Sequence, residues 1–130
     1  MTDEQQGQAK KYILIAEDDS AYGNVYQSKL ENEGYEVKVT NSGDAVLAEI
    51  HSRKPDLLIL DLMMLDKDGF EVLEELQNQN LLNDIKVIVA SNLSQDADRQ
   101  KVKKFNILDY FVKSDISVTE MVEKIKTALK

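Results

Sequence analysis

Short apolar runs alternate with longer amphipathic stretches along most of this chain. The apolar runs have the length of strands and cover residues 12–16, 36–40, 57–60, 86–90 and 110–112. Three of them contain the continuous apolar sequences ILIA, LLIL and VIVA, which are typical of strands covered on both faces in a parallel sheet. The pattern therefore predicts five strands, of which the central ones are buried on both sides.

The stretches between these runs carry apolar residues at helical spacing. They predict five helices, at residues 21–33, 42–53, 69–79, 95–105 and 117–129. In the first helix we expect Val25 and Tyr26 on the buried side. Ser117 and Glu120 have the spacing of a capping box at the start of the last helix. The fourth helix contains few apolar residues, so we expect it to be held loosely.

Strands that alternate with helices form a parallel sheet with right-handed crossover connections. We therefore expect an α/β fold, namely a flavodoxin-like, doubly wound (βα)5 three-layer sandwich with a parallel five-stranded sheet of order 2-1-3-4-5. Residues 1–10 are polar and offer nothing to bury, so we expect a flexible N-terminal tail and then one domain at 11–130. Ligands of such sheets bind at the carboxyl ends of the strands.

Composition narrows the function. The chain has 24 acidic and 16 basic residues, and its net charge is −8. Because phosphate contacts need concentrated Lys and Arg, we expect no direct binding to nucleic acid. The absence of cysteine excludes disulfides and thiolate metal sites. We find no signal peptide and no apolar stretch long enough to span a membrane, so we expect a cytoplasmic protein without membrane contact.

Polar side chains follow four of the predicted strands, at the edge where ligands bind. Glu17 and Asp18 follow the first strand, Asp61 the third, Ser91 the fourth and Lys113 the fifth. Three carboxylates beside one ammonium group leave an excess of negative charge, which calls for a divalent cation with oxygen ligands. Mg²⁺ suits such a site, with Mn²⁺ as a substitute.

A metal site alone needs neither Ser91 nor Lys113. A phosphoryl group on Asp61 would use both, because its oxygens need hydroxyl and ammonium donors in addition to the cation. Carboxylates are covalent phosphoryl acceptors in other proteins. Taken singly, Ser91 is also an ordinary strand-end hydroxyl and Lys113 an ordinary surface base, so the hypothesis depends on their joint placement.

Over residues 11–130 the chain resembles the receiver domain of two-component response regulators. The matching segments are ILIAEDD, PDLLILDLMMLDKDG, VIVAS and DYFVK, in this order. The resemblance implies that Asp61 is the phospho-acceptor. It also implies that Mg²⁺ is held by Glu17, Asp18, Asp61 and the backbone carbonyl of Met63.

The resemblance further implies roles for residues of the last two strands. Lys113 would pair with the phosphoryl group, Ser91 would be the switch hydroxyl that moves towards it, and Tyr110 would be the aromatic switch residue that changes rotamer. Met63 and Leu93 stand at the two positions whose side chains tune hydrolysis in the family. Because both are apolar and cannot orient a water molecule, we expect a long-lived phosphoaspartate.

A signalling switch follows from the resemblance, rather than an enzyme that acts on a separate substrate. The phosphoryl group would come from a sensor histidine kinase or a histidine phosphotransfer protein. A downstream protein would bind the face formed by the fourth and fifth helices, and a phosphorylation-dependent dimer is compatible with this face. The chain ends with the last helix, which fits a stand-alone regulator, a phosphorelay intermediate or an excised fragment. The alternative function is a receiver-like module that binds proteins without phosphorylation.

Three residues depart from the usual pattern of the family. Leu65 and Ser114 stand where proline is usual, and Asn92 stands where a small residue is common. A cis bond before Ser114 would cost about 2.5–4 kcal/mol, so we expect either a trans bond or local strain there. We expect the bulk of Asn92 to restrict the entry of the phosphodonor.

Overall fold

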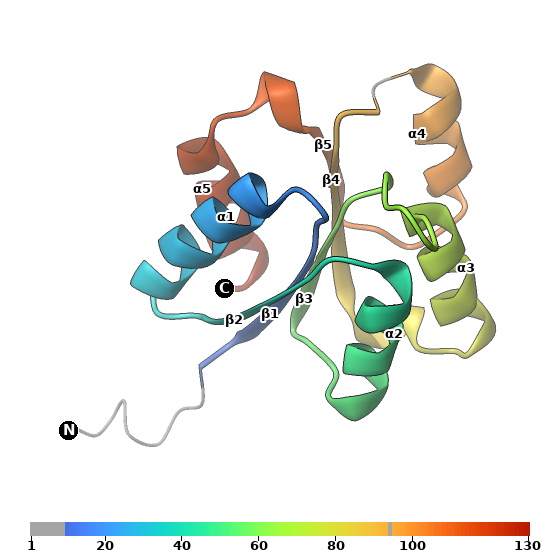
Figure 1. Cartoon of the computed structure of the whole chain (residues 1–130), viewed down its shortest axis with the longest axis horizontal. Coiled ribbons are helices and arrows are strands. Elements are labelled where there is room, and N and C mark those ends of the chain that lie inside the picture. The colour runs from blue at the N-terminus through green and yellow to red at the C-terminus, as the bar shows by residue number, and fades with distance from the viewer. Residues whose placement is uncertain (1–9, 94) are drawn as a thin grey trace.

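The computed structural model describes residues 10–93 and 95–130, which form a parallel sheet between two layers of helices (Figure 1). The strands are β1 (Tyr12–Ala16), β2 (Glu36–Thr40), β3 (Leu57–Leu60), β4 (Lys86–Ser91) and β5 (Asp109–Val112). They pair in the order β2-β1-β3-β4-β5, and every pairing is parallel. The expected fold class and strand order are therefore confirmed. The expected tail at residues 1–10 falls almost wholly on residues 1–9, which lie outside the described residues.

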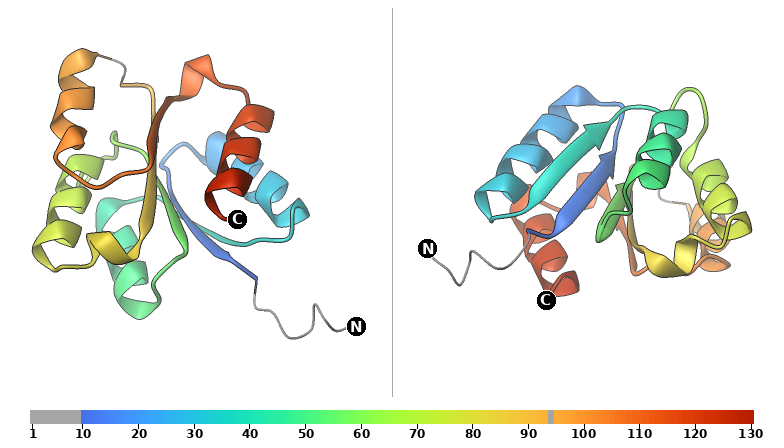
Figure 2. Two further views of the ribbon diagram at one scale, coloured as in Figure 1. Left: turned by 180° about the vertical axis from the view of Figure 1, so that it is seen from behind. Right: turned by 90° about the horizontal axis from the view of Figure 1, so that it is seen from below.

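Helices cover both faces of the sheet, as the two further views show (Figure 2). One face carries α1 (Ser20–Asn32) and α5 (Val118–Ala128), and the other carries α2 (Gly43–Ser52), α3 (Gly69–Asn78) and α4 (Asp96–Lys103). Two short 3₁₀ turns, η2 (Leu82–Asp84) and η3 (Lys113–Asp115), precede β4 and follow β5. Within the described ranges, no helix is long and apolar enough to cross a membrane.

The strand register explains why the central strands are apolar throughout. Leu14 and Leu58 are register partners and belong to the core beneath α2, α3 and α4. The next pair, Ile15 and Ile59, belongs to the core beneath α1 and α5. Because successive side chains of a strand point to opposite faces, and helices cover both, no position in these strands meets water.

The buried side of α1 differs from the prediction. The helix buries Gly23, Tyr26 and Leu30, and Gly23 packs so closely on β2 that a Cβ atom there would lie 3.1 Å from Val39 Cγ1. This contact fixes the rotation of the helix. Val25 lies about 100° around the axis from Tyr26 and is 42% exposed, so its expected burial is wrong.

The fourth and fifth helices differ in how much they bury. The capping box predicted for α5 is present, since Ser117 and Glu120 each accept the other's backbone N–H at 3.0 Å. Its apolar side is buried against the sheet. By contrast, α4 buries only Val102 within its bounds, and Phe105 just after it. The sparse apolar pattern of this segment is thus reflected in its packing.

Candidate functional site

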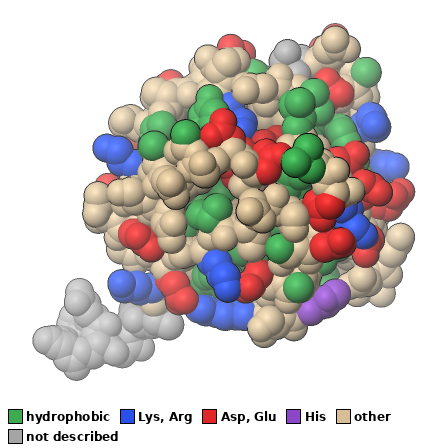
Figure 3. All heavy atoms as spheres, in the orientation of Figure 1, with side chains coloured by type: hydrophobic (Ala, Val, Ile, Leu, Met, Phe, Trp, Pro, Cys, Tyr) green, Lys and Arg blue, Asp and Glu red, His purple; other side chains and the backbone are tan. Residues whose placement is uncertain are grey.

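The carboxyl ends of β1, β3 and β5 open into one cavity of about 560 Å³. Its lining includes the acidic residues that follow β1, the loop after β3, Asn92 and Leu93 after β4, and Lys113 after β5. In the space-filling view, acidic and apolar side chains meet in the upper middle of the visible face (Figure 3). The cavity lies where a doubly wound sheet is expected to bind its ligand.

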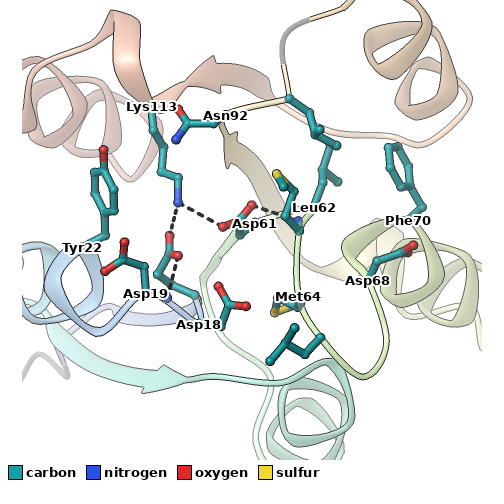
Figure 4. Close-up of a pocket in the computed structure, with 14 residues that line it drawn as sticks. Asp18, Asp19, Tyr22, Asp61, Leu62, Met64, Asp68, Phe70, Asn92 and Lys113 are labelled. Atoms are coloured by element: carbon teal, nitrogen blue, oxygen red, sulfur yellow. Dashed lines mark hydrogen bonds and ion pairs between the residues drawn. The ribbon is translucent and has the colours of Figure 1, made fainter.

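Three carboxylates converge in this cavity. Glu17, Asp18 and Asp61 each offer one oxygen, and these oxygens all lie within 4.8 Å of one another. Glu17 and Asp61 are buried, whereas Asp18 is exposed. The close-up shows Asp18 and Asp61 in the same part of the cavity (Figure 4). The described residues therefore contain a cluster of hard oxygen ligands, which is the donor set that Mg²⁺, Ca²⁺ and Mn²⁺ prefer.

The ammonium group of Lys113 bridges two of these carboxylates. Lys113 is 6% exposed, and its Nζ donates to Glu17 Oε1 at 2.7 Å and to Asp61 Oδ2 at 3.0 Å. A third side of the ammonium faces the Tyr22 ring, whose centroid is 4.4 Å from Nζ. Such a cation–π contact keeps the ammonium in place without offering it an acceptor atom.

The backbone holds the two buried carboxylates in fixed positions. The Asp61 N–H donates to the Ala16 carbonyl at 3.0 Å, and Asp61 Oδ1 accepts the Met63 N–H at 3.0 Å. Glu17 Oε2 accepts the Asp19 N–H at 3.1 Å. Asp18 forms no comparable bond among the described residues, so it is the carboxylate that can adjust most freely to a ligand.

The close approach of charged groups shifts the pKa values of Glu17 and Lys113. Burial, together with the nearby charge of Asp61, raises the pKa of Glu17 to about 7. Burial on its own would lower the pKa of Lys113, but hydrogen bonds to Glu17 and Asp61 leave that pKa above its ordinary value. One ammonium group faces three carboxylates, and the remaining negative charge favours a bound divalent cation.

The two predicted switch residues lie beside the cavity rather than in its lining. Ser91 is fully buried, and its Oγ accepts the Leu93 N–H at 3.4 Å. The Tyr110 hydroxyl donates to the Leu93 carbonyl at 2.7 Å. Both side chains therefore meet at the backbone of Leu93, whose own side chain lines the cavity.

The loop after β3 places apolar side chains at the rim. Met63 and Leu65 line the cavity and are 52% and 95% exposed. The loop is anchored away from the cavity, because the Asp66 carboxylate accepts the N–H groups of Gly43 and Asp44 at 3.0 and 3.1 Å. Leu65 thus projects outward from a fixed loop.

The remaining departures lie at the ends of β4 and β5. The bond between Lys113 and Ser114 is trans, as are all peptide bonds of residues 10–93 and 95–130. The Ser114 N–H donates to Asn92 Oδ1 at 3.0 Å, which joins the two loops across the top of the cavity. Asn92 lines the cavity next to Lys113.

Sequence reasoning missed the part that Tyr22 plays in this site. From the sequence, Tyr22 is only one more aromatic residue of the first helix. The signal was its position: Tyr22 lies in the first turn of the helix that starts directly after the acidic pair. A side chain of that turn is close to the carboxyl end of β1 and can reach Lys113.

Comparison with known proteins agrees with this geometry. The family model of the response regulator receiver domain matches residues 13–126. The alkaline phosphatase synthesis transcriptional regulatory protein PhoP of Bacillus subtilis is 30% identical over 120 residues, which are 92% of this chain and 49% of that protein. Response regulator RR06 of Streptococcus pneumoniae is 34% identical over 118 residues, 91% of this chain and 52% of that protein. The chain thus corresponds to about half the length of these relatives.

Solved structures show the same likeness. A CheY-like receiver domain protein from Methanospirillum hungatei superposes with a TM-score of 0.84 at 28% identity, covering 93% of this chain and 94% of that one. The Mn²⁺-bound form of response regulator Rcp1 gives a TM-score of 0.80 at 27% identity, covering 90% and 92%. Together with the cavity at the carboxyl ends of β1, β3 and β5, these matches show that the chain belongs to the response regulator receiver domain family.

Proposed function

We propose that this receiver domain is a signalling switch controlled by phosphorylation of Asp61. The observation that carries the proposal is the cluster of three carboxylates, two of which, Glu17 and Asp61, accept hydrogen bonds from the buried ammonium group of Lys113. The phosphoryl group would come from a phosphohistidine of a sensor histidine kinase or a phosphotransfer protein. Such a site can hold a divalent cation and a phosphoryl group together, because the cation and the Lys113 ammonium group offset the negative charge of the carboxylates and of the phosphoryl oxygens.

The donor set fits Mg²⁺, with Mn²⁺ as a substitute. Glu17, Asp18, Asp61 and the backbone carbonyl of Met63 would hold the ion. The carboxylate cluster supports this assignment, and the Mn²⁺-bound form described for Rcp1 supports it by analogy. When bound, the cation would neutralise the charge that develops on the transferred phosphoryl oxygens.

The transfer is a displacement at phosphorus. A carboxylate oxygen of Asp61 attacks the phosphorus atom and forms an O–P bond. The P–N bond to the donor histidine breaks, and its electron pair leaves with the imidazole nitrogen. Lys113 already donates to Asp61 Oδ2, so a small shift brings its ammonium group to a phosphoryl oxygen. In this way the chain promotes its own modification and does not turn over a separate substrate.

The product should persist. Hydrolysis requires a water molecule positioned for attack on the phosphorus, and a polar side chain near the group usually provides that position. Met63 and Leu93 line the cavity with apolar side chains. We therefore expect slow autodephosphorylation.

The output would pass through Leu93 to the face of α4, β5 and α5. Ser91 and Tyr110 contact the Leu93 backbone from two sides, so movement of one affects the other. A downstream protein, or a second copy in a phosphorylation-dependent dimer, would bind this face. The net charge of −8 favours a protein over nucleic acid as the direct partner. A cytoplasmic location, expected from the sequence, remains a prediction.

Intact mass spectrometry tests the proposal directly. Wild type incubated with Mg²⁺ and acetyl phosphate should gain the mass of one phosphoryl group, and Asp61→Asn should gain none. Asp96→Asn, which alters an exposed carboxylate on α4, is the matched control and should label as wild type does. Chelation of the metal should abolish labelling. If wild type gains no mass, the proposal fails and the phosphorylation-independent binding module becomes the better account.

A further inference from the structure

Asn92 occupies a bridging position at the mouth of the cavity. It follows β4 directly, and Ser114 lies just beyond β5, the neighbouring strand. Asn92 Oδ1 accepts the Ser114 backbone N–H at 3.0 Å. In the close-up, Asn92 lies beside Lys113 at the top of the site (Figure 4). The side chain is exposed, yet this bond gives it a defined place.

The bond also fixes which end of the amide faces the cavity. A backbone N–H can only donate, so its partner must be the carbonyl oxygen of the carboxamide. The amide is planar, so its NH₂ group then lies on the other branch. Among residues 10–93 and 95–130, Nδ2 of Asn92 has no hydrogen-bond acceptor. Two N–H donors are therefore presented at the mouth of a cavity that is otherwise rich in carboxylates.

We propose that Asn92 donates a hydrogen bond from Nδ2 to an oxygen of the phosphoryl group on Asp61. The inference rests on the proposed function and adds a residue to it. A phosphoryl group has three strongly accepting oxygens, which is more than the ammonium group of Lys113 can satisfy alone. The Asn92 amide, in the loop after β4, is already oriented by its bond to Ser114. It can therefore stabilise the charge of the transferred group without losing further side-chain freedom.

Ser114 is part of this arrangement through its backbone. A proline at position 114 would have no N–H. The Asn92 amide would then lose the donor that orients it and could turn either end towards the cavity. The two departures from the family pattern thus depend on each other: Ser114 supplies the N–H, and Asn92 uses it to direct its amide.

The competing interpretation makes Asn92 a steric cover that restricts entry of the phosphodonor. The two interpretations predict opposite results for the rate of labelling by acetyl phosphate at saturating Mg²⁺. If Asn92 is a donor, Asn92→Ala should be slower, by about tenfold for one hydrogen bond to a charged group. Asn92→Asp should be slower still, because it keeps the acceptor for Ser114 but turns an oxygen towards the phosphoryl group. If Asn92 is a cover, the alanine variant should be faster. The alanine variant therefore decides between the two interpretations, because the added charge of the aspartate variant repels the anionic phosphodonor on either of them.

The control is Asn106→Ala, which removes an exposed amide before the amino end of β5, whereas the cavity lies at the carboxyl end, so this variant should label at the wild-type rate. Unfolding midpoints should differ only slightly among the variants, because the bond that Asn92→Ala loses to Ser114 lies at an exposed position. A readout independent of rate is the side-chain ¹⁵N–¹H signal of Asn92, which should shift on phosphorylation. Unchanged or faster labelling of Asn92→Ala, with wild type labelled normally, would overturn the role of Asn92 alone. Failure of wild type to label would overturn the proposed function.

Discussion

Helices α4 and α5 flank the same edge of the sheet on opposite faces, and they are held in different ways (Figure 1). Helix α5 buries Met121, Val122 and Ile125 against the sheet. Helix α4 buries Val102 alone. Since packing of an apolar face supplies most of the stability of a helix in a protein, α5 should open only with the whole domain, whereas α4 can open locally.

Charged side chains partly replace apolar packing in α4. The Arg99 guanidinium lies 4.7 Å from the centroid of the Tyr110 ring, and Lys101 Nζ lies 4.1 Å from that of Phe70. These contacts connect α4 to β5 and to α3 through groups at the surface. Strand β5 thus has a firm side, covered by α5, and a loose side, covered by α4. Tyr110 contacts both the loop beside the cavity, through Leu93, and helix α4, through Arg99. A change at Asp61 should therefore alter the packing of α4 more than that of α5.

The largest expected effect comes from the firm side. Ile125→Ala leaves a cavity under α5 and should lower the free energy of unfolding by about 2–5 kcal/mol. Urea denaturation should show one cooperative transition with a lower midpoint. Val25→Ala on the exposed side of α1 is the control and should change the stability by less than about 0.5 kcal/mol. If Val102→Ala in α4 proved as costly as Ile125→Ala, the contrast between the two helices would be wrong.

A smaller effect is expected where the loose side meets the loop. Tyr110→Phe removes the hydroxyl that donates to the Leu93 carbonyl, at a cost of about 0.5–1.5 kcal/mol. Amide hydrogen exchange should quicken in α4 and in the loop before it, while exchange in α5 stays the same. Tyr35→Phe makes the same change directly before β2, the strand at the opposite edge of the sheet, and should leave both helices as they are. Equal quickening in α5 would mean that β5 transmits the change to both sides.

Much of the architecture could be predicted because short runs of sequence determine the strands and helices. The run Leu57–Leu60 is apolar at every position, and only a strand covered on both faces explains that pattern at this length. The strand order then brings the residues after each strand to one edge. Glu17, Asp61 and Lys113 could therefore be grouped from the sequence, although they are far apart in the chain.

The details that escaped prediction depend on side-chain directions between distant segments. The close approach of Gly23 to β2 sets the rotation of α1 and leaves Val25 outside. The burial of Ser91 depends on how the loop after β4 folds back on it. Asp66 was one acid among many in the sequence, and only the structure shows it joined to the first turn of α2.

The contacts of Asp66 depend on pH, unlike the cation–π contacts of α4. The N–H groups of Gly43, Lys67 and Asp44 hold the pKa of Asp66 down to about 2, below its ordinary value of 3.8. Its contribution to stability is therefore present above about pH 4 and is lost as the pH falls towards 2. Wild type should unfold at a higher temperature than Asp66→Asn at neutral pH, and the difference should shrink on acidification. The cation–π contacts of α4 involve Arg99 and Lys101 and no carboxylate, so loss of the Asp66 charge should leave them as they are.

The smallest expected effect tests whether the cation–π contact of α4 matters at all. Arg99→Gln removes the charge over the Tyr110 ring and should favour local opening of α4 by about 0.5–1 kcal/mol. Hydrogen exchange of the α4 amides should then quicken a few-fold, with global stability almost unchanged. Arg99→Lys keeps the charge but not the planar group and should retain part of the protection. Lys103→Gln removes the same charge from the same helix without a ring contact, so it should have less effect. Equal quickening in Lys103→Gln would assign the stabilisation to the net charge of the helix and not to the contact between Arg99 and the Tyr110 ring.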